Sequence, residues 1–359
     1  MKRRTFLFLS ALGVVGSGCS RALTQTRVRK HDWKSEWADL RLWYRQPAAN
    51  WNEAMPIGNG RLAAMVFGGL QSEKIQLNED TIWAGEKRDR LNPEGARNLA
   101  EVRRLLFAGK PKEAEVLAER TMIAVPKRMP PYQPLGDLLL RFSGQENATD
   151  YVRELDIDTG IVRVTYQSQD ARFTREVFAS AVDQVIVIRL TSDRPRRISF
   201  TTTLTRGQDS KTRVVSPDRV VIEGEAIARG DRHPLERKVG VKFQGVLQVV
   251  SEGGTRRVVG NEVSVENANA ATLIFAAATN FRHKDPGGKC EQDLLAARKS
   301  YSRLRGTHVN DHRRLFRRVE FNLGASAPNL PTDERLKRVQ AGEKASRWKR
   351  CSSNSDVIC

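Results

Sequence analysis

The sequence predicts a mainly β protein: a large antiparallel β-sandwich (a supersandwich) followed by a short α-helical linker. Short apolar segments separated by turn residues recur almost without a break from Leu135 to Thr279. Many strands with hairpin-length connections form antiparallel layers, because their edges must be paired and their apolar faces stacked. These segments outnumber the strands of a seven-stranded sandwich, so a large one is expected.

The first strands are expected soon after residue 37. Leu40 to Tyr44 and Arg61 to Phe67 are apolar, and the turn residues Gly58-Asn59-Gly60 precede the second segment. Lys74 to Leu77 alternates between polar and apolar residues, which is typical of a half-buried strand.

The spacing then changes to that of helices. Apolar residues recur at three- and four-residue steps from Ala96 to Leu106, which predicts an amphipathic helix ending at Gly109. A second short helix is expected from Lys112 to Met122. Proline lacks the N–H that a helix or ladder requires, so an irregular crossing is predicted at Pro126, Pro130, Pro131 and Pro134.

Alternation of period two dominates the middle of the chain. The strands expected there are 138–140, 161–166, 173–178, 185–190, 198–204, 220–222, 239–250, 258–265 and 273–278. After Asn280 one helix is expected from Cys290 to Leu304, and Thr307 is expected to cap the next. Residues 318–323 resume β alternation, and a last helix is expected from Asp333.

Charge and composition argue against several kinds of partner. The formal net charge is +19, but the positive residues are scattered and no recognition motif or aromatic-basic platform accompanies them, so no nucleic-acid partner is predicted. The four cysteines lack framework spacing, and no Cys/His cluster has the spacing of metal ligands. With no phosphate loop or dinucleotide fingerprint, neither a metal nor a cofactor is predicted.

The N-terminus predicts export. Lys2-Arg3-Arg4 precedes an apolar run from Phe6 to Val15 and small residues up to Cys19, as in a secretory signal. Arg3-Arg4 resembles a twin-arginine signal, and the residues ending at Cys19 resemble a lipobox, so Cys19 is the candidate for lipid anchoring to a membrane. Residues 1–19 are interpreted as a signal peptide and residues 20–37 as a polar spacer. The expected location is the periplasm, the outer membrane or the cell surface of a bacterium.

Glu79 and Asp80 form the most obvious carboxylate pair. Glycoside hydrolysis needs two carboxyl groups on either side of the scissile bond. Neighbouring residues on a strand point to opposite faces, so this pair does not fit that geometry. A structural role is favoured, with turn hydrogen bonds that involve Asn78 and Thr81.

Other candidates have ordinary structural interpretations beside the functional ones. Gly-Asn-Gly at Asn59 is typical of a tight turn. Tryptophan stacks on sugar faces, but buried packing is the favoured role for Trp33, Trp37, Trp43, Trp51 and Trp83. For His308, Asp311 and His312, capping and surface hydrogen bonding are favoured over catalysis, because no serine or cysteine motif lies beside them. The candidate contacts to a glycan or another domain are Asn59, Asn78, Glu79 and Trp83.

Five strings, in matching order and spacing, closely resemble the N-terminal region of glycoside hydrolase family 95, which contains α-L-fucosidases and related α-L-galactosidases. They are WNEAMPIGNGRLAAMVFGG (51–69), IQLNEDTIWAG (75–85), YQPLGD (132–137), HVNDHRRLFRRV (308–319) and LPTDERL (330–336). The resemblance implies a large β-sandwich, a helical linker, an (α/α)6 barrel and a small C-terminal β domain. It also implies inverting hydrolysis of terminal α-linked fucose without a metal or organic cofactor, by residues of the barrel.

This resemblance divides the chain. Residues 38–282 form the expected sandwich and residues 283–344 the helical linker, so no catalytic residue is assigned. Residues 345–359 form a polar, basic tail; read in a shifted frame with freely chosen codons, they encode a string similar to the first barrel helix. We therefore expect a fragment of an exported α-L-fucosidase-like enzyme that acts on fucosylated glycans and whose barrel is missing or separately encoded. The alternative is a free-standing exported carbohydrate-binding or scaffold module.

Overall fold

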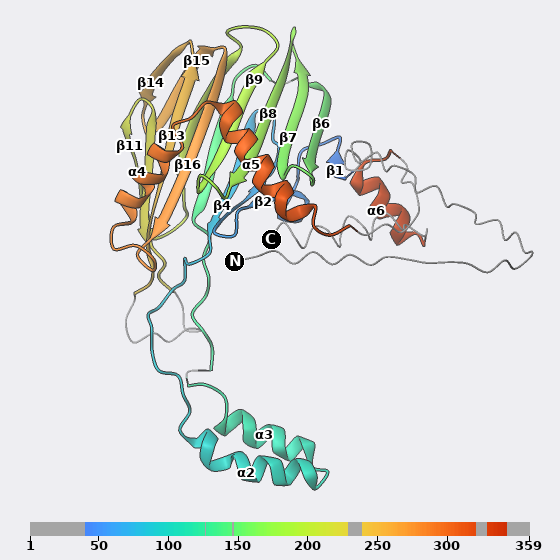
Figure 1. Cartoon of the computed structure of the whole chain (residues 1–359), viewed down its shortest axis with the longest axis vertical. Helices are drawn as coiled ribbons and strands as arrows, with labels where there is room; N and C mark the ends of the chain where they lie inside the picture. Colours follow the sequence, from blue (N-terminus) through green and yellow to red (C-terminus); the bar gives the residue numbers. More distant parts are fainter. Residues whose placement is uncertain (1–39, 126, 146, 229–238, 321–328, 343–359) are drawn as a thin grey trace, which may run out of the picture.

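Two stacked antiparallel sheets form the body of the protein (Figure 1). The computed structural model describes residues 40–125, 127–145, 147–228, 239–320 and 329–342. The predicted signal peptide (1–19), spacer (20–37) and tail (345–359) lie outside these ranges, as do Cys19, Trp33 and Trp37. The prediction of a large antiparallel sandwich followed by helices is confirmed.

The larger sheet has nine strands. Its strands, in spatial order, are β1 (Arg41–Tyr44), β6 (Thr149–Asp156), β7 (Ile161–Ser168), β8 (Ala171–Ser180), β9 (Val185–Ser192), β16 (Ala270–Thr279), β13 (Lys242–Glu252), β12 (Arg219–Glu225) and β11 (Ser210–Ser216). The smaller sheet has seven strands, in the order β14 (Thr255–Val259), β15 (Glu262–Ala268), β10 (Ile198–Thr205), β5 (Gly136–Phe142), β4 (Ser72–Glu79), β3 (Leu62–Val66) and β2 (Met55–Gly58).

The core lies between the sheets and follows the period-two pattern. In β4, Ile75 and Leu77 point inward, while in β9 the inward residues are Ile186, Ile188 and Leu190. Because successive strand residues point to opposite faces, this alternation fixes the register of each strand. A second apolar cluster lies on the outer face of the nine-stranded sheet.

Helices cover that outer face. α4 (Pro286–Ala296) and α5 (Tyr301–Phe316) lie against it, and α6 (Thr332–Gln340) lies beside β1 (Figure 1). Leu294, Leu304 and Val309 of these helices form one apolar cluster with Phe178 and Ile274 of the sheet. All ten residues of β16 are therefore buried, which explains its continuous apolar sequence.

The prediction of one helix over residues 290–304 was wrong. The chain breaks after Ala297, and the side chain of Ser300 accepts a hydrogen bond from the backbone N–H of Arg303 to begin α5. Thr307 lies inside α5, where its hydroxyl donates to the carbonyl oxygen of Arg303 at 3.0 Å, so it is not a cap. The last helix was predicted one residue from its observed start.

The predicted pair of helices near residue 100 forms a hairpin that projects from the sandwich (Figure 1). α2 (Glu94–Phe107) and α3 (Pro111–Thr121) share a small apolar cluster of Val102, Leu105 and Ala114. Gly109 connects them at a φ of +71°, a conformation that favours glycine.

Several strands were missed or merged. The segment expected as one strand over 258–265 is a hairpin of β14 and β15, with a turn at Gly260. β2, β6 and β11 were not predicted, because polar residues and one proline interrupt their apolar patterns. Residues 318–320 are not a strand, and residues 321–323 lie outside the described ranges.

We predict that Gly136→Ala destabilises the sandwich. Gly136 has a φ of +149°, and a Cβ there would lie 2.4 Å from the carbonyl oxygen of Thr205 on the neighbouring strand. The expected loss of unfolding free energy is at least about 2 kcal/mol, measured by urea denaturation. Gly207→Ala is the matched control, because no atom lies within 4 Å of its added Cβ. Equal stability of the two variants would contradict the prediction.

Candidate functional site

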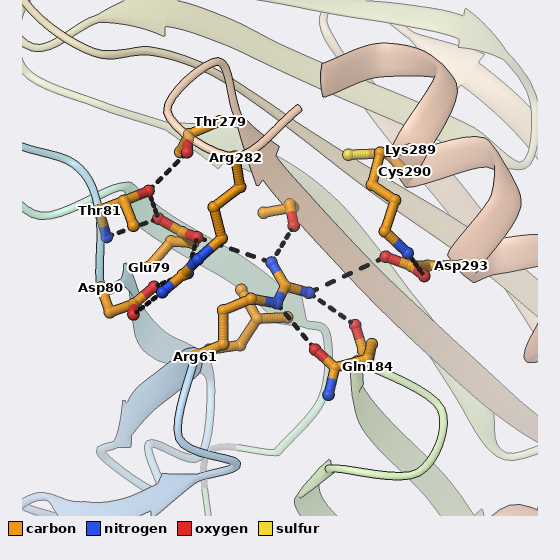
Figure 2. Close-up of polar contacts among 12 residues, drawn as sticks. Arg61, Glu79, Asp80, Thr81, Gln184, Thr279, Arg282, Lys289, Cys290 and Asp293 are labelled. Carbon is orange, nitrogen blue, oxygen red and sulfur yellow. Dashed lines mark hydrogen bonds and ion pairs between the residues drawn. The ribbon is translucent and has the colours of Figure 1, made fainter. Parts of the chain in front are cut away.

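A polar network lies at the end of β4, and Glu79 is its centre (Figure 2). The carboxyl group of Glu79 is 1% exposed. One of its oxygens accepts hydrogen bonds from the backbone N–H and the hydroxyl of Thr81, at 2.8 and 2.6 Å. Its other oxygen lies 3.7 Å from Arg61 and 3.5 Å from Arg282. Burial raises the pKa of Glu79, and the hydrogen bonds from Thr81 oppose that shift.

Asp80 points outward from the same turn. Its two oxygens accept hydrogen bonds from the guanidinium of Arg282 at 2.6 and 2.7 Å, and this contact lowers the pKa of Asp80. Both carboxyl groups of the pair therefore contact one arginine, and Glu79 is almost inaccessible. This geometry is suited to holding a turn rather than to flanking a scissile bond.

Arg61 connects the network to the opposite sheet and to α4. Its Nε donates to the side chain of Gln184 at 2.8 Å, and its Nη1 donates to the carbonyl oxygen of Ala277 at 2.5 Å. Asp293 of α4 lies 3.9 Å away and accepts a hydrogen bond from Lys289. Sequence reasoning missed Arg61, because nothing in a Gly-Asn-Gly-Arg turn indicates how far the arginine reaches.

Trp83 and Tyr132 form an aromatic edge beside Asp80. The two rings pack edge to face, with centroids 5.5 Å apart, and Trp83 Nε1 donates to the carbonyl oxygen of Asp80 at 3.2 Å. The hydroxyl of Tyr132 lies 2.9 Å from the Glu79 carbonyl oxygen and 3.2 Å from Asn78 Oδ1. Burial and the two nearby carboxylates raise the pKa of Tyr132 to about 12.

Three of the four candidate residues thus lie together: Asn78, Glu79 and Trp83. The expectation of buried packing was wrong for Trp83, which is 41% exposed, and for Trp51, which is 55% exposed. Trp43 is half-buried, with the guanidinium groups of Arg41 and Arg45 each 5.4 Å from its ring centroid. Arg282 and Tyr132 were not singled out, since their partners are distant in the sequence.

Asn59 holds the turn between β2 and β3, one residue before Gly60. Its Oδ1 accepts hydrogen bonds from the backbone N–H groups of Arg61 and Leu62, at 3.1 and 2.8 Å, and its Nδ2 donates to Ser180. Gly60 has a φ of +86°. Asn59 therefore has the turn geometry that the Gly-Asn-Gly sequence indicates.

A pocket of about 240 Å³ separates this turn from α5. Its lining residues are Gly58, Asn59, Gly60, Ala179, Ala181, His308, Asp311, His312, Leu315 and Phe316. They include no serine or cysteine, so this described pocket offers no hydroxyl or thiol nucleophile.

The expectation of surface hydrogen bonding was wrong for His308. Its side chain is 5% exposed and stacks on Phe178 with ring centroids 4.6 Å apart. Burial and the neighbouring His312 lower the pKa of His308 to about 4, while the backbone of Thr159 and Gly160 and the charge of Asp311 oppose that shift. His312 Nε2 lies 2.9 Å from the carbonyl oxygen of Ile157.

A buried carboxylate, Asp158, and a partly buried one, Glu176, attach α5 to the sandwich. Asp158, in the turn after β6, accepts hydrogen bonds from Arg313 at 2.9 Å and from Arg317 at 2.6 and 2.7 Å. Glu176 of β8 accepts a hydrogen bond from Tyr301 at the start of α5. These contacts fix both ends of the helix on the nine-stranded sheet.

A second set of contacts attaches α6 to the edge of that sheet. Thr332 accepts a hydrogen bond from the backbone N–H of Trp43 at 2.9 Å. Glu334 forms an ion pair with Arg45 at 3.0 Å, and Asp333 accepts a hydrogen bond from Gln46. These contacts hold α6 at the β1 edge of the nine-stranded sheet.

The described ranges contain neither a metal-ligand cluster nor a membrane-spanning helix. No cluster of three or more His, Cys, Asp or Glu side chains is arranged to hold a metal ion there. Cys290 is buried, and burial raises the pKa of its thiol to about 12, so it is a poor nucleophile. In the same part of the chain, no helix has the length and apolar character needed to cross a bilayer.

Comparison with known proteins divides the chain in two. Residues 42–284 match the glycosyl hydrolase family 65 N-terminal domain, and residues 300–350 match the glycosyl hydrolase family 95 catalytic domain. Helices α5 and α6 lie within the second match.

Similar full-length proteins extend well beyond this chain. "Alpha-L-fucosidase 2" of Arabidopsis thaliana is 34% identical over 81% of this chain and 37% of its own length. "Probable alpha-fucosidase A" of Aspergillus niger is 28% identical over 88% of this chain and 41% of its own length. The chain thus spans about two fifths of these relatives. A bacterial glucoamylase complexed with acarbose, 7% identical over 78% of this chain and 41% of its own, has a TM-score of 0.34, too low to support a conclusion.

We predict that Asp158→Asn loosens α5. The substitution keeps the side-chain volume but removes the negative charge of the group that accepts hydrogen bonds from Arg313 and Arg317. The expected loss of unfolding free energy is about 1–3 kcal/mol. Hydrogen exchange should become faster in α5 and the unfolding free energy should fall. The control is Asp311→Asn, a substitution within α5 itself. The ion pair of Asp311 with Arg314 lies at the surface and contributes less than about 1 kcal/mol to the unfolding free energy. Unchanged exchange in α5 would refute this assignment.

We predict that His308 makes the fold acid-sensitive. Its pKa is about 4 in the folded chain, against an ordinary value of 6.5. Between these values the unfolded chain binds a proton at this histidine that the folded chain does not. The contribution of His308 to the unfolding free energy is therefore complete above pH 6.5 and is lost as the pH falls toward 4. The loss attributable to His308 is up to about 3 kcal/mol.

Urea denaturation at several pH values between 4 and 7 checks this slope. His308→Gln should reduce the stability at neutral pH, because the stacked ring is lost, but should flatten the dependence on pH. Parallel pH profiles for the variant and the original chain would show that other groups cause the acid sensitivity.

Proposed function

This chain belongs to the α-L-fucosidase-like glycoside hydrolases of family 95, and we propose that its sandwich is the non-catalytic support of their catalytic domain. The substrate of the whole enzyme is proposed to be a glycan with terminal α-linked fucose, in line with the names of the relatives. The sandwich would hold the first helices of the catalytic domain in position.

The observation that carries this proposal is the attachment of α5. This helix lies in the part that matches the catalytic domain, and Asp158 and Glu176 of the sandwich hold its two ends. Charge-assisted hydrogen bonds of this kind fix geometry as well as adding stability. A helix held at both ends transmits the orientation of the sandwich to whatever follows it in the chain.

A supporting role also agrees with the state of the carboxyl groups in the Glu79 network. A glycosidase needs one carboxyl group that donates a proton and a second that activates water or attacks the sugar. Glu79 is enclosed by Thr81, Arg61 and Arg282, and Asp80 is paired with Arg282. The acid and base of the reaction are therefore proposed to lie in the catalytic domain.

Export to the cell envelope remains part of the proposal. It rests on the basic residues at positions 2–4, the apolar run from Phe6 to Val15 and the small residues before Cys19. Fractionation of cells that express the tagged chain would test it, and a cytoplasmic, full-length product would contradict it.

The supporting role predicts no fucose release from 2′-fucosyllactose by the purified chain alone. A chimaera in which this chain replaces the aligned part of Alpha-L-fucosidase 2 should release fucose. Asp158→Asn in the chimaera should lower its kcat, since α5 leads into the catalytic domain, whereas Asp311→Asn should not. Fucose release by the chain alone, or equal rates for the two chimaera variants, would contradict the supporting role.

A further inference from the structure

One end of the sandwich carries an exposed tryptophan in a polar frame, and we propose that it binds the ring face of a neutral saccharide. We call this surface the Trp83 edge and define it by Asn78, Asp80, Trp83, Tyr132 and Arg282. The use of a fucosylated probe rests on the proposed function, whereas the surface is defined by its own geometry.

The indole of Trp83 is held in one orientation. Its Nε1 donates to the carbonyl oxygen of Asp80 at 3.2 Å, and Tyr132 packs against it edge to face. Tyr132 is held in turn by the Glu79 carbonyl oxygen at 2.9 Å. An exposed aromatic ring that is already ordered binds a partner at a low cost in conformational entropy.

The charged groups beside the indole cancel each other. Asp80 and Arg282 form a bidentate pair, and both side chains are partly exposed, at 38% and 41%. A nearly neutral pair does not select for an anion or a cation. It does offer a carboxylate that accepts and a guanidinium that donates, which is what sugar hydroxyl groups require.

Two further groups extend this frame. Tyr132 keeps its phenolic proton well above neutral pH. Asn78 accepts from Tyr132 through Oδ1, while its amide nitrogen donates to no residue of the described ranges. A flat apolar ring surrounded by donors and acceptors matches the chemistry of a pyranose, which has an apolar face and polar edges.

Trp51 is also exposed, so exposure alone does not distinguish Trp83 from the other surface tryptophan. It is more exposed than Trp83, but its indole has neither a ring contact nor a hydrogen bond among the described residues. Its neighbours Asn50 and Glu53 hydrogen-bond to each other within the short helical turn. Trp51 is therefore a matched control: a surface tryptophan of the same chain without the polar frame.

The test is binding of the purified full chain to immobilised 2′-fucosyllactose, with lactose and maltose as further neutral probes. The original chain and Trp51→Ala should bind at least one of these probes with equal affinity. Trp83→Ala should bind about tenfold or more weakly. High salt should change the affinity little, because the ligand is uncharged.

A measurement on the unsubstituted chain guards against a misfolded variant. In 15N-labelled protein, titration with the bound sugar should shift the indole N–H resonance of Trp83 and leave that of Trp51 in place. Binding to none of the three sugars, equal affinity of Trp83→Ala and the original chain, or no shift at Trp83 would overturn the proposal.

The outcome is separable from that of the supporting role. If Trp83→Ala lowers fucose release by the chimaera while the chain binds no sugar, the Trp83 edge contacts the catalytic domain instead. That result overturns the saccharide site and leaves the supporting role intact. If the chain binds sugar at Trp83 but the chimaera is inactive, the saccharide site is supported and the supporting role is contradicted.

Discussion

The centre of the nine-stranded sheet is apolar on both faces, and burial of β16 on both sides is the constraint from which the rest of the arrangement follows. Its inner face meets the seven-stranded sheet, and its outer face would be exposed to water without α4 and α5. Covering such a face is strongly favourable, since each large apolar side chain contributes about 1.5–3 kcal/mol. α4 and α5 therefore complete a second apolar layer on the sheet, and the segment that matches the catalytic domain begins on a surface already ordered by packing.

Polar contacts then decide where the helices lie on that apolar face. Apolar burial is non-directional, so it does not by itself fix the position of a helix along a sheet. Asp158 at one end of α5 and Glu176 at the other accept hydrogen bonds from particular side chains of the helix. Arg61 acts similarly for α4 and both sheets through Gln184 and Asp293. Buried charges of this kind contribute little net stability, but they penalise every arrangement that leaves them unpaired.

The sequence was sufficient for features that depend on local periodicity. The continuous apolar run of β16, the alternation of β4 and the amphipathic pattern of α2 each predicted the observed element. It was insufficient for features that depend on contacts between residues distant in the sequence. α5 begins after Ser300 and contacts β8, and the ring of Trp83 packs on Tyr132, which is 49 residues away. The reach of Arg61 across two sheets has no local signal, since a long side chain after a turn is usually solvated.

The stretch from Asn78 to Trp83 shows how one short segment serves both the interior and the surface. Glu79 points inward and accepts two hydrogen bonds from Thr81, which fixes the chain reversal at the end of β4. That reversal turns Asp80 and Trp83 outward, and the carbonyl oxygen of Asp80 then orients the indole. The buried carboxylate is therefore best understood as a positioning residue: it is 1% exposed, and the geometry of the exposed ring depends on the turn that it holds. A carboxylate in such a motif need not be catalytic, because holding a turn at the rim of a sandwich is sufficient physical reason for its burial.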